Sequence, residues 1–216
     1  MKYRCLIFDH DDTVVNSTAT IHHPAFLEFL KIYRPGMTCS LEEYFCKNFD
    51  PGFVDMCLQD YSMSMDELHQ EEDFWRAYVA NHIPEAYPGI KEIMDEQKRQ
   101  GGLIAVISHS MKENILRDYA ANGLPEPDII FGWEQPPERR KPNAWPLLQV
   151  LETFDLGVKD ALMIDDLKPG YDMARSVGVD FAAVGWSNDV ASIERFMRAN
   201  CENYFKSVAE FRAFLQ

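Results

Sequence analysis

The sequence is poor in cationic side chains. Lys and Arg together account for 21 of the 216 residues and Asp and Glu for 35, so the formal net charge is −14. Binding to the phosphate backbone of DNA or RNA depends on a face rich in Lys and Arg, and this composition offers no material for one. We therefore expect no nucleic-acid partner.

Long apolar runs and paired cysteine motifs are also missing. Apolar runs such as residues 104–107 and 181–185 are far shorter than the roughly 20 residues that a membrane span needs. Asp9 stands too close to the first residue for the apolar core of a signal peptide. The five cysteines are odd in number and form no C-x-x-C pair, which fits reduced thiols and gives no zinc signature. We expect a cytoplasmic protein without a membrane partner.

The sequence does contain short, unbroken apolar segments, which are typical of strands buried on both faces. These segments cover residues 3–8, 103–107, 129–132, 161–164 and 181–184. Helical stretches alternate with the later segments and are each followed by glycine, which commonly ends a helix. These stretches cover residues 88–100, 112–122 and 169–177. The alternation predicts an α/β protein with a doubly wound parallel sheet, whose functional loops lie at the carboxyl ends of the strands.

A long insertion separates the first predicted strand from the second. Residues 15–86 read as mostly helical, with capping boxes at Ser40–Glu43 and Ser64–Glu67 that open two helices. We expect a helical cap domain over residues 15–86, inserted into a core of residues 1–14 and 87–216. The insertion holds 12 acidic and 4 basic residues, so it carries −8 of the net charge of −14. We expect its acids to face mainly solvent, where they do not repel an anionic substrate.

Carboxylates follow the first predicted strand. Asp9 and Asp11 point to the same side of an extended chain, while His10 points away. Two acids at one site can divide roles, one ionised as a nucleophile or metal ligand and the other serving as a proton donor. For this motif alone the alternative, a loop in which Asp and Thr13 cap a helix, stays open. We expect His10 to be a buried residue oriented by a hydrogen bond.

Three further polar motifs end later predicted strands. Ser108 precedes a helix, where its hydroxyl and the free N–H groups would bind an anion or simply cap the helix. Lys141, fixed by the following proline, would place its charge on a phosphate or lie in a solvated turn. Asp165 and Asp166 would join Asp9 as oxygen ligands of Mg²⁺, or belong to a polar loop. All four motifs fall where α/β sheets build their sites, and chance placement explains this poorly.

The ordered motifs, together with Tyr87-Pro88-Gly89-Ile90 and Gly178-Val179, resemble the haloacid dehalogenase-like hydrolase superfamily, in particular its phosphatase and phosphomutase branch. The resemblance covers essentially the whole chain. It implies a Rossmann-like core with a helical cap, and a Mg²⁺-dependent phosphatase that acts on a small phosphorylated metabolite. The acid at position 11 argues against the dehalogenase reaction, because a halide leaves without a proton.

The resemblance also implies roles for individual residues. Asp9 would be the nucleophile that forms an aspartyl-phosphate and binds Mg²⁺. Asp11 would be the general acid and base, and its backbone carbonyl would complete a metal shell that also includes Asp165 and Asp166. Thr13 would support the loop, and the phosphate-binding residues would be Thr13, Ser108, His109 and Lys141. His109 departs from the asparagine that the family often has after the serine.

Two other functions stay open. A phosphomutase similar to β-phosphoglucomutase would carry a cap-hinge histidine at the position of Ile21, one residue before His22. A non-catalytic phosphate-binding protein would keep the fold without turnover. In the cap, Asn16, His22, His23 and Trp75 are within reach of a substrate by position. We expect structural roles for them instead, with the histidines at a helix N-terminus and the tryptophan in the cap core.

Overall fold

Six strands form one parallel sheet in the computed structural model, which describes residues 2–216. They lie in the order β3-β2-β1-β4-β5-β6, so β1 is flanked by β2 and β4. Their bounds are β1 Cys5–Phe8, β2 Leu103–Ile107, β3 Ile129–Phe131, β4 Ala161–Asp165, β5 Asp180–Val184 and β6 Asn203–Phe205. The predicted doubly wound sheet is confirmed, and each apolar segment contributes one strand. The edge strand β6 was not predicted, because its three half-buried residues form no apolar run.

Helices cover both faces of the sheet. Leu6 and Phe8 of β1 pack into a cluster with α5, α6 and α10, while Cys5 and Ile7 pack into a cluster with α7 and α8. The helices are α5 (Ile90–Arg99), α6 (Lys112–Ala121), η2 (Pro137–Arg139), α7 (Trp145–Thr153), α8 (Lys168–Val177), α9 (Ala191–Asn200) and α10 (Val208–Leu215). Alternate side chains of a strand point to opposite faces, so β1 is buried on both sides. No described helix is long and apolar enough to cross a membrane.

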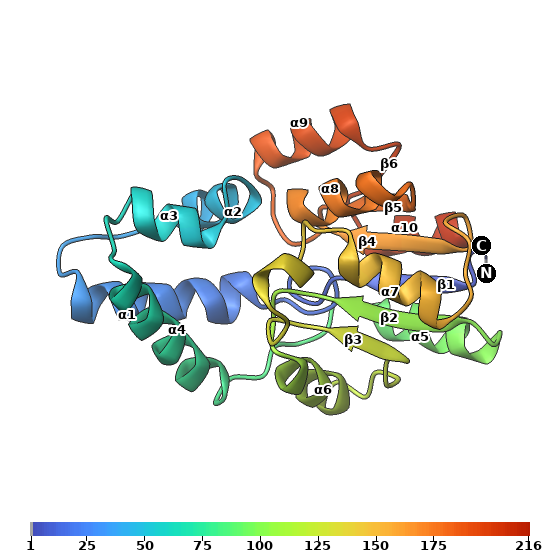
Figure 1. Cartoon of the computed structure of the whole chain (residues 1–216), viewed down its shortest axis with the longest axis horizontal. Helices are drawn as coiled ribbons and strands as arrows, with labels where there is room; N and C mark the ends of the chain where they lie inside the picture. The colour runs from blue at the N-terminus through green and yellow to red at the C-terminus, as the bar shows by residue number, and fades with distance from the viewer. Residues whose placement is uncertain (1) are drawn as a thin grey trace.

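The insertion between β1 and β2 is helical. Its elements are the π-helix η1 (Thr18–His22) and the α-helices α1 (His23–Tyr33), α2 (Leu41–Phe49), α3 (Phe53–Gln59) and α4 (Met65–Val79). Figure 1 shows these elements, which we call the helical segment, gathered beyond the carboxyl ends of the strands. They enclose their own apolar cluster, which includes Phe26, Phe29 and Met56. Both predicted capping boxes are formed, at Ser40 and Ser64.

The acidic side chains of the helical segment lie mainly in solvent, as predicted. Eight of the 12 acids of residues 15–86 are exposed, and only Glu71 is buried. Most of the negative charge of this segment therefore lies in solvent, and Glu71 is the one buried acid among residues 15–86.

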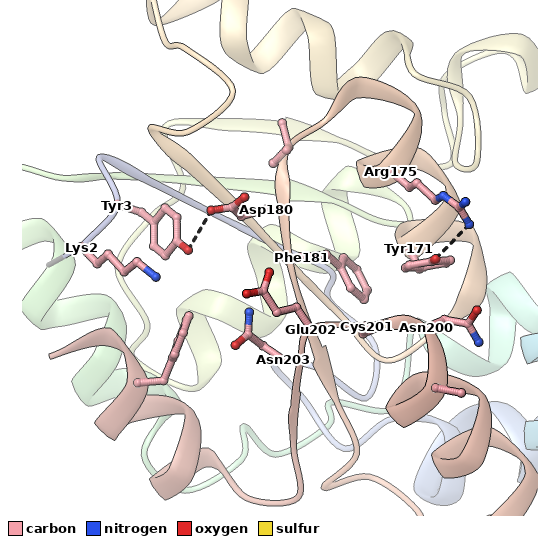
Figure 2. A pocket seen from close by; sticks show the side chains of 13 residues that line it. Lys2, Tyr3, Tyr171, Arg175, Asp180, Phe181, Asn200, Cys201, Glu202 and Asn203 are labelled. Carbon is pink, nitrogen blue, oxygen red and sulfur yellow. Dashed lines mark hydrogen bonds between the residues drawn. The ribbon is translucent and has the colours of Figure 1, made fainter.

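A pocket of about 640 Å³ opens at the amino edge of the sheet, away from the predicted site. Figure 2 shows two pairs of its polar side chains joined by hydrogen bonds. The Tyr3 hydroxyl donates to Asp180 at 3.1 Å, and Arg175 donates to the Tyr171 hydroxyl at 3.1 Å. None of the predicted site residues lines this pocket.

Candidate active site

The loop after β1 places its acids at the centre of the carboxyl edge. Asp9 is buried, and the Lys141 ammonium lies 2.9 Å from its Oδ1 as a charge contact without hydrogen-bond alignment. Asp12 has a φ of +59°, a left-handed conformation that Asp tolerates better than most residues. Its Oδ1 accepts a hydrogen bond from the Thr18 backbone N–H at 3.2 Å, so the loop is tied directly to the first turn of the helical segment.

Lys141 is a buried cation held between two carboxylates. Its ammonium donates to Asp165 Oδ2 at 2.7 Å, in addition to its contact with Asp9. Burial by itself would lower the pKa of Lys141, but the charges of Asp165 and Asp9 outweigh burial and raise it. The open alternative of a solvated basic turn is therefore wrong, because the Lys141 side chain is 2% exposed. The site holds a permanent positive charge beside Asp9.

His109 forms a hydrogen bond with the backbone of this lysine. Its Nε2 lies 3.0 Å from the Lys141 carbonyl oxygen, and its ring meets the Trp133 ring edge-on at 5.7 Å. Burial, followed by the charge of Lys141, lowers the pKa of His109 to about 4, so the ring is neutral near neutral pH and donates from Nε2. In this structure His109 orients the backbone that carries Lys141.

Asp9, Asp165 and Asp166 form a cluster in which one carboxylate oxygen of each lies within 4.8 Å of the others. Both oxygens of Asp165 are engaged, one by the Leu167 N–H at 2.8 Å and the other by Lys141. Asp166 accepts a hydrogen bond from the Thr13 hydroxyl at 3.2 Å. Burial, and then the charges of Asp12 and Asp165, raise the pKa of Asp166 well above its usual value. Three buried acids with one lysine between them fit a hard divalent cation.

Asp11 accepts hydrogen bonds from three side chains, one in the loop after β2 and two at the ends of η1. Ser110 Oγ donates to its Oδ2 at 2.5 Å, while Ser17 Oγ and His22 Nε2 approach its Oδ1 at 2.7 and 2.9 Å. Burial by itself would raise the pKa of Asp11, but the charge and hydrogen bond of His22 and the hydroxyl of Ser110 lower it sharply. Asp11 is therefore an ionised carboxylate in this arrangement.

His22 precedes α1 as its N-cap, as expected, and together with Trp75 it is also connected to Asp11 by hydrogen bonds that the sequence did not predict. Trp75 Nε1 donates to His22 Nδ1 at 2.9 Å, which leaves the His22 Nε2–H to donate to Asp11. Burial alone lowers the pKa of His22, and the charge of Asp11 raises it overall. The indole N–H can donate only to an unprotonated Nδ1, so these contacts describe the neutral ring, which acts on Asp11 through its Nε2 hydrogen bond. A proton on Nδ1 would break the bond from the indole and add the charge of His22 to its effect on Asp11.

The π-helix η1 explains why the sequence register missed His22. The Ser17 carbonyl accepts from both Ile21 N at 2.8 Å and His22 N at 3.0 Å, so the turn is wider than an α-helical one. The extra residue buries Ile21 and brings His22 to Asp11, one position later than the register predicted. No residue pattern marks a π-turn, so the register that placed Ile21 at this position could not show the shift to His22.

His10 is buried and oriented by a hydrogen bond, as predicted. Its Nε2 lies 3.1 Å from Asp118 Oδ2 on α6. The next side chain, Arg117, donates to Asp118 at 2.8 Å and also to the carbonyl oxygens of Val79 and His82 at 2.9 and 3.2 Å. The loop between the two key acids is thus connected to the linker that follows α4.

The remaining candidates divide between the site and the scaffold. Ser108 Oγ accepts from the Ser110 N–H at 3.1 Å, and α6 begins at Lys112 without a side-chain cap, so the helix-cap alternative is wrong for Ser108. Thr13 contacts Asp166 and lies in the loop that it was expected to support. His23 bonds the Cys39 carbonyl at 2.8 Å and is structural, as expected. Asn16 pairs with Glu85 through its backbone.

These contacts define a Rossmann-like α/β protein with a lysine–carboxylate site at the carboxyl edge of its sheet, covered by a helical segment. Residues 6–184 match the family model for haloacid dehalogenase-like hydrolases, and the chain belongs to this family. It is therefore a hydrolase by family, and the resemblance seen in the sequence is confirmed.

Known relatives share this fold at low sequence identity. Pyrophosphatase PpaX from Halalkalibacterium halodurans is 23% identical over 197 residues, which are 87% of this chain and 86% of the relative. A structure described as a predicted phosphoglycolate phosphatase from Haemophilus somnus has a TM-score of 0.78 at 20% identity, covering 100% of this chain and 99% of that chain. A variant of CbbY from Rhodobacter sphaeroides, in complex with xylulose-(1,5)bisphosphate, has a TM-score of 0.72 at 20% identity and 96% coverage of both chains.

Proposed function

We propose that this protein is a Mg²⁺-dependent phosphatase that hydrolyses a small phosphomonoester through an aspartyl-phosphate on Asp9. The observation that carries the proposal is the meeting of Asp9, Lys141, Asp165 and Asp166 at one sheet edge, with Asp11 beside them. The names of the relatives, a pyrophosphatase and a phosphoglycolate phosphatase, support phosphate hydrolysis as the reaction class. In this proposal residues 1–14 and 87–216 form the catalytic core and residues 15–86 the cap.

Asp9 has the surroundings that a carboxylate nucleophile needs. The ammonium of Lys141 lies 2.9 Å from its Oδ1, where it would also neutralise the phosphoryl oxygens. The Ser108 hydroxyl follows the adjacent strand β2. Phosphoryl transfer requires in-line placement and charge neutralisation more than covalent chemistry from the protein. His109 contributes by holding the Lys141 backbone in place.

Asp11 is the general acid and base of the proposal. As an ionised carboxylate it fits the second step, in which it takes a proton from the water that attacks the aspartyl-phosphate. For the first step it must itself carry a proton to the leaving oxygen. Two of its three hydrogen-bond donors, Ser17 and His22, belong to residues 15–86. Movement of this segment away from the core would raise the pKa of Asp11 and allow it to be protonated.

The acid cluster would hold Mg²⁺. Asp9, Asp166 and the backbone carbonyl of Asp11 are the proposed ligands, since Lys141 and the Leu167 N–H already engage both oxygens of Asp165. When bound, the ion supplies positive charge to the phosphoryl oxygens. Asp165 then serves chiefly to position Lys141, and Thr13 to position Asp166.

Phosphate release from a panel of phosphomonoesters, measured with and without Mg²⁺, tests the proposal. We expect turnover that requires Mg²⁺ and falls at least a thousandfold in Asp9→Asn, in line with loss of a nucleophile that acts as part of a catalytic unit. Phosphate release that survives this substitution would rule out the aspartyl-phosphate mechanism. Tight binding without turnover across the panel would favour a phosphate-binding protein.

One observation favours a phosphomutase as the second candidate. The mutase resemblance calls for a histidine at the cap hinge, and the π-helix brings His22 to Asp11 although the sequence register placed Ile21 there. Analysis of the products decides between the two reactions. A mutase returns an isomerised sugar phosphate with little free phosphate, whereas a phosphatase releases phosphate in equal amount to the substrate consumed.

A further inference from the structure

His10 lies between the two proposed catalytic acids, Asp9 and Asp11, yet its side chain is bonded to α6. The side chain is 1% exposed, and its Nε2 donates to Asp118 Oδ2 at 3.1 Å. Its Nδ1 has no hydrogen-bond partner within residues 2–216, so the bond to Asp118 alone orients the ring. A buried polar side chain is costly unless a hydrogen bond compensates for the lost water. The proposed chemistry gives this histidine no part.

Asp118 is held on its other side by Arg117. Its Oδ2 binds His10, and its Oδ1 accepts from Arg117 Nε at 2.8 Å and lies 2.7 Å from Nη2 of the same guanidinium. The guanidinium also donates to the carbonyl oxygens of Val79 and His82, at 2.9 and 3.2 Å. Removing one member of a buried ion pair leaves an uncompensated charge. Asp118 is therefore a fixed junction between the catalytic loop and the linker that follows α4, residues 80–87.

The backbone of His10 holds the other linker, residues 14–17. Its carbonyl oxygen accepts from the N–H groups of Val14 and Val15, at 2.9 and 3.1 Å. The next residue, Asn16, donates its backbone N–H to the Glu85 carbonyl at 2.9 Å, which joins the two linkers. The side chain of His10 is thus connected to one linker through α6, and its backbone is connected to the other.

Asn122 on α6 closes these contacts into a ring of hydrogen bonds. Its amide nitrogen donates to the Asp118 carbonyl at 2.8 Å and to the Pro84 carbonyl at 3.0 Å. Its amide oxygen accepts from the Ala86 N–H at 2.8 Å. The ring runs from the catalytic loop through both linkers and α6 back to His10. Because the ring is closed, the loop cannot shift without breaking at least one of its buried bonds.

We propose that His10 is a positioning residue for the phosphatase reaction. Its hydrogen bond to Asp118 holds the loop so that Asp9 and Asp11 stand in the geometry that phosphoryl transfer requires. Arg117 acts on the same bond through Asp118. The proposal rests on the phosphatase function given above, and it assigns no contact between His10 and the substrate. Placement of the reacting groups affects the chemical step, so a shifted loop lowers kcat more than it changes KM.

Steady-state rates on the fastest phosphomonoester of the panel, at saturating Mg²⁺, compare matched variants. His10→Leu removes the hydrogen bond, and His10→Gln restores a side-chain N–H that donates to Asp118. Arg117→Met removes the partner that holds Asp118. Tyr119→Phe is the control, because the Tyr119 ring packs on that of His10 with centroids 5.8 Å apart, while its hydroxyl has no hydrogen-bond partner within residues 2–216.

We expect His10→Leu to lower kcat at least tenfold and to change KM less than about threefold. His10→Gln should recover kcat to within about threefold of the wild type, and Tyr119→Phe should leave it unchanged. Arg117→Met should lower kcat about fivefold, and the double variant should be no slower than His10→Leu, since both substitutions act on one bond. An unchanged kcat in His10→Leu would overturn the proposal. So would losses that multiply in the double variant, or an equal loss in Tyr119→Phe.

Hydrogen exchange gives a second readout that needs no turnover. The N–H groups of Val14 and Val15 bond the His10 carbonyl, so their exchange, followed by NMR, should accelerate at least tenfold in His10→Leu and not in Tyr119→Phe. Unchanged exchange in His10→Leu would overturn the proposal. Accelerated exchange in His10→Leu, together with no phosphate release from any ester in the wild type, would instead count against the phosphatase function and leave His10 as the residue that positions the loop.

Discussion

The buried Glu71 carboxyl has a consequence for stability that does not depend on any substrate. Its pKa is raised from an ordinary 4.5 to about 8, with burial as the main cause. An acid whose pKa is higher in the folded than in the unfolded protein favours folding when it is protonated. That contribution is complete below about pH 4.5 and is lost as pH rises through about 8. Glu71→Gln cannot ionise, so it should escape this loss.

The size of the effect follows from the shift. Each pH unit of difference corresponds to about 1.4 kcal/mol, so a rise from 4.5 to about 8 sets an upper limit of about 5 kcal/mol. Water that reaches the carboxylate at high pH reduces this value. We expect the free energy of unfolding of Glu71→Gln, relative to that of the wild type, to increase by about 3 kcal/mol between about pH 5 and about pH 8.

Urea unfolding followed by circular dichroism at several pH values measures this difference, with Asp73→Asn as a control at an exposed position of α4. The curve for the control should run parallel to that of the wild type. Parallel curves for Glu71→Gln as well would show that Glu71 titrates normally in the folded protein. The reasoning from its burial would then be wrong, even if the variant were more stable at every pH.

Three further predictions concern the site. Mg²⁺ should raise the melting temperature by about 5 °C, and Asp166→Asn should abolish this rise. Without Mg²⁺ the same variant should melt at a higher temperature than the wild type, because it removes a buried carboxylate that its neighbours repel. An unchanged response to Mg²⁺ in Asp166→Asn would exclude Asp166 as a ligand. Trp75→Phe should lower kcat about tenfold with little change in KM, because His22 loses the hydrogen bond that orients it toward Asp11. Stopped-flow and steady-state rates measure this change, and an unaltered kcat would contradict the prediction. Arg117→Met should lower the free energy of unfolding by about 2 kcal/mol in urea titrations, since Asp118 loses its buried partner; a change below about 0.5 kcal/mol would refute this.

Much of the fold was readable in the sequence. Strands buried on both faces give unbroken apolar segments, so β1 to β5 stand out. Capping boxes mark the starts of α2 and α4 through a specific side-chain exchange with the backbone. The helix α9 was not predicted, because no proline, glycine or capping box marks its ends. Sequence patterns predict a helix or a strand only where a local feature, such as a capping box or an unbroken apolar segment, marks it.

The candidate site was readable in part. Asp9, Lys141, Asp165 and Asp166 follow predicted strands, and a parallel sheet brings the carboxyl ends of its strands to one edge. The groups that the helical segment contributes were missed, because they depend on how it packs over this edge. The contact of His22 with Asp11 requires a π-turn.

The attachment of α6 to the linker after α4 uses only backbone groups of that linker. Arg117 donates to the carbonyl oxygens of Val79 and His82, and Asn122 donates to the Pro84 carbonyl and accepts from the Ala86 N–H. Every residue type offers a carbonyl, so these hydrogen bonds require nothing of the linker side chains beyond a backbone N–H at position 86. A helical segment taken from another member of the family could therefore be grafted onto this core, provided that its linker follows the same backbone path.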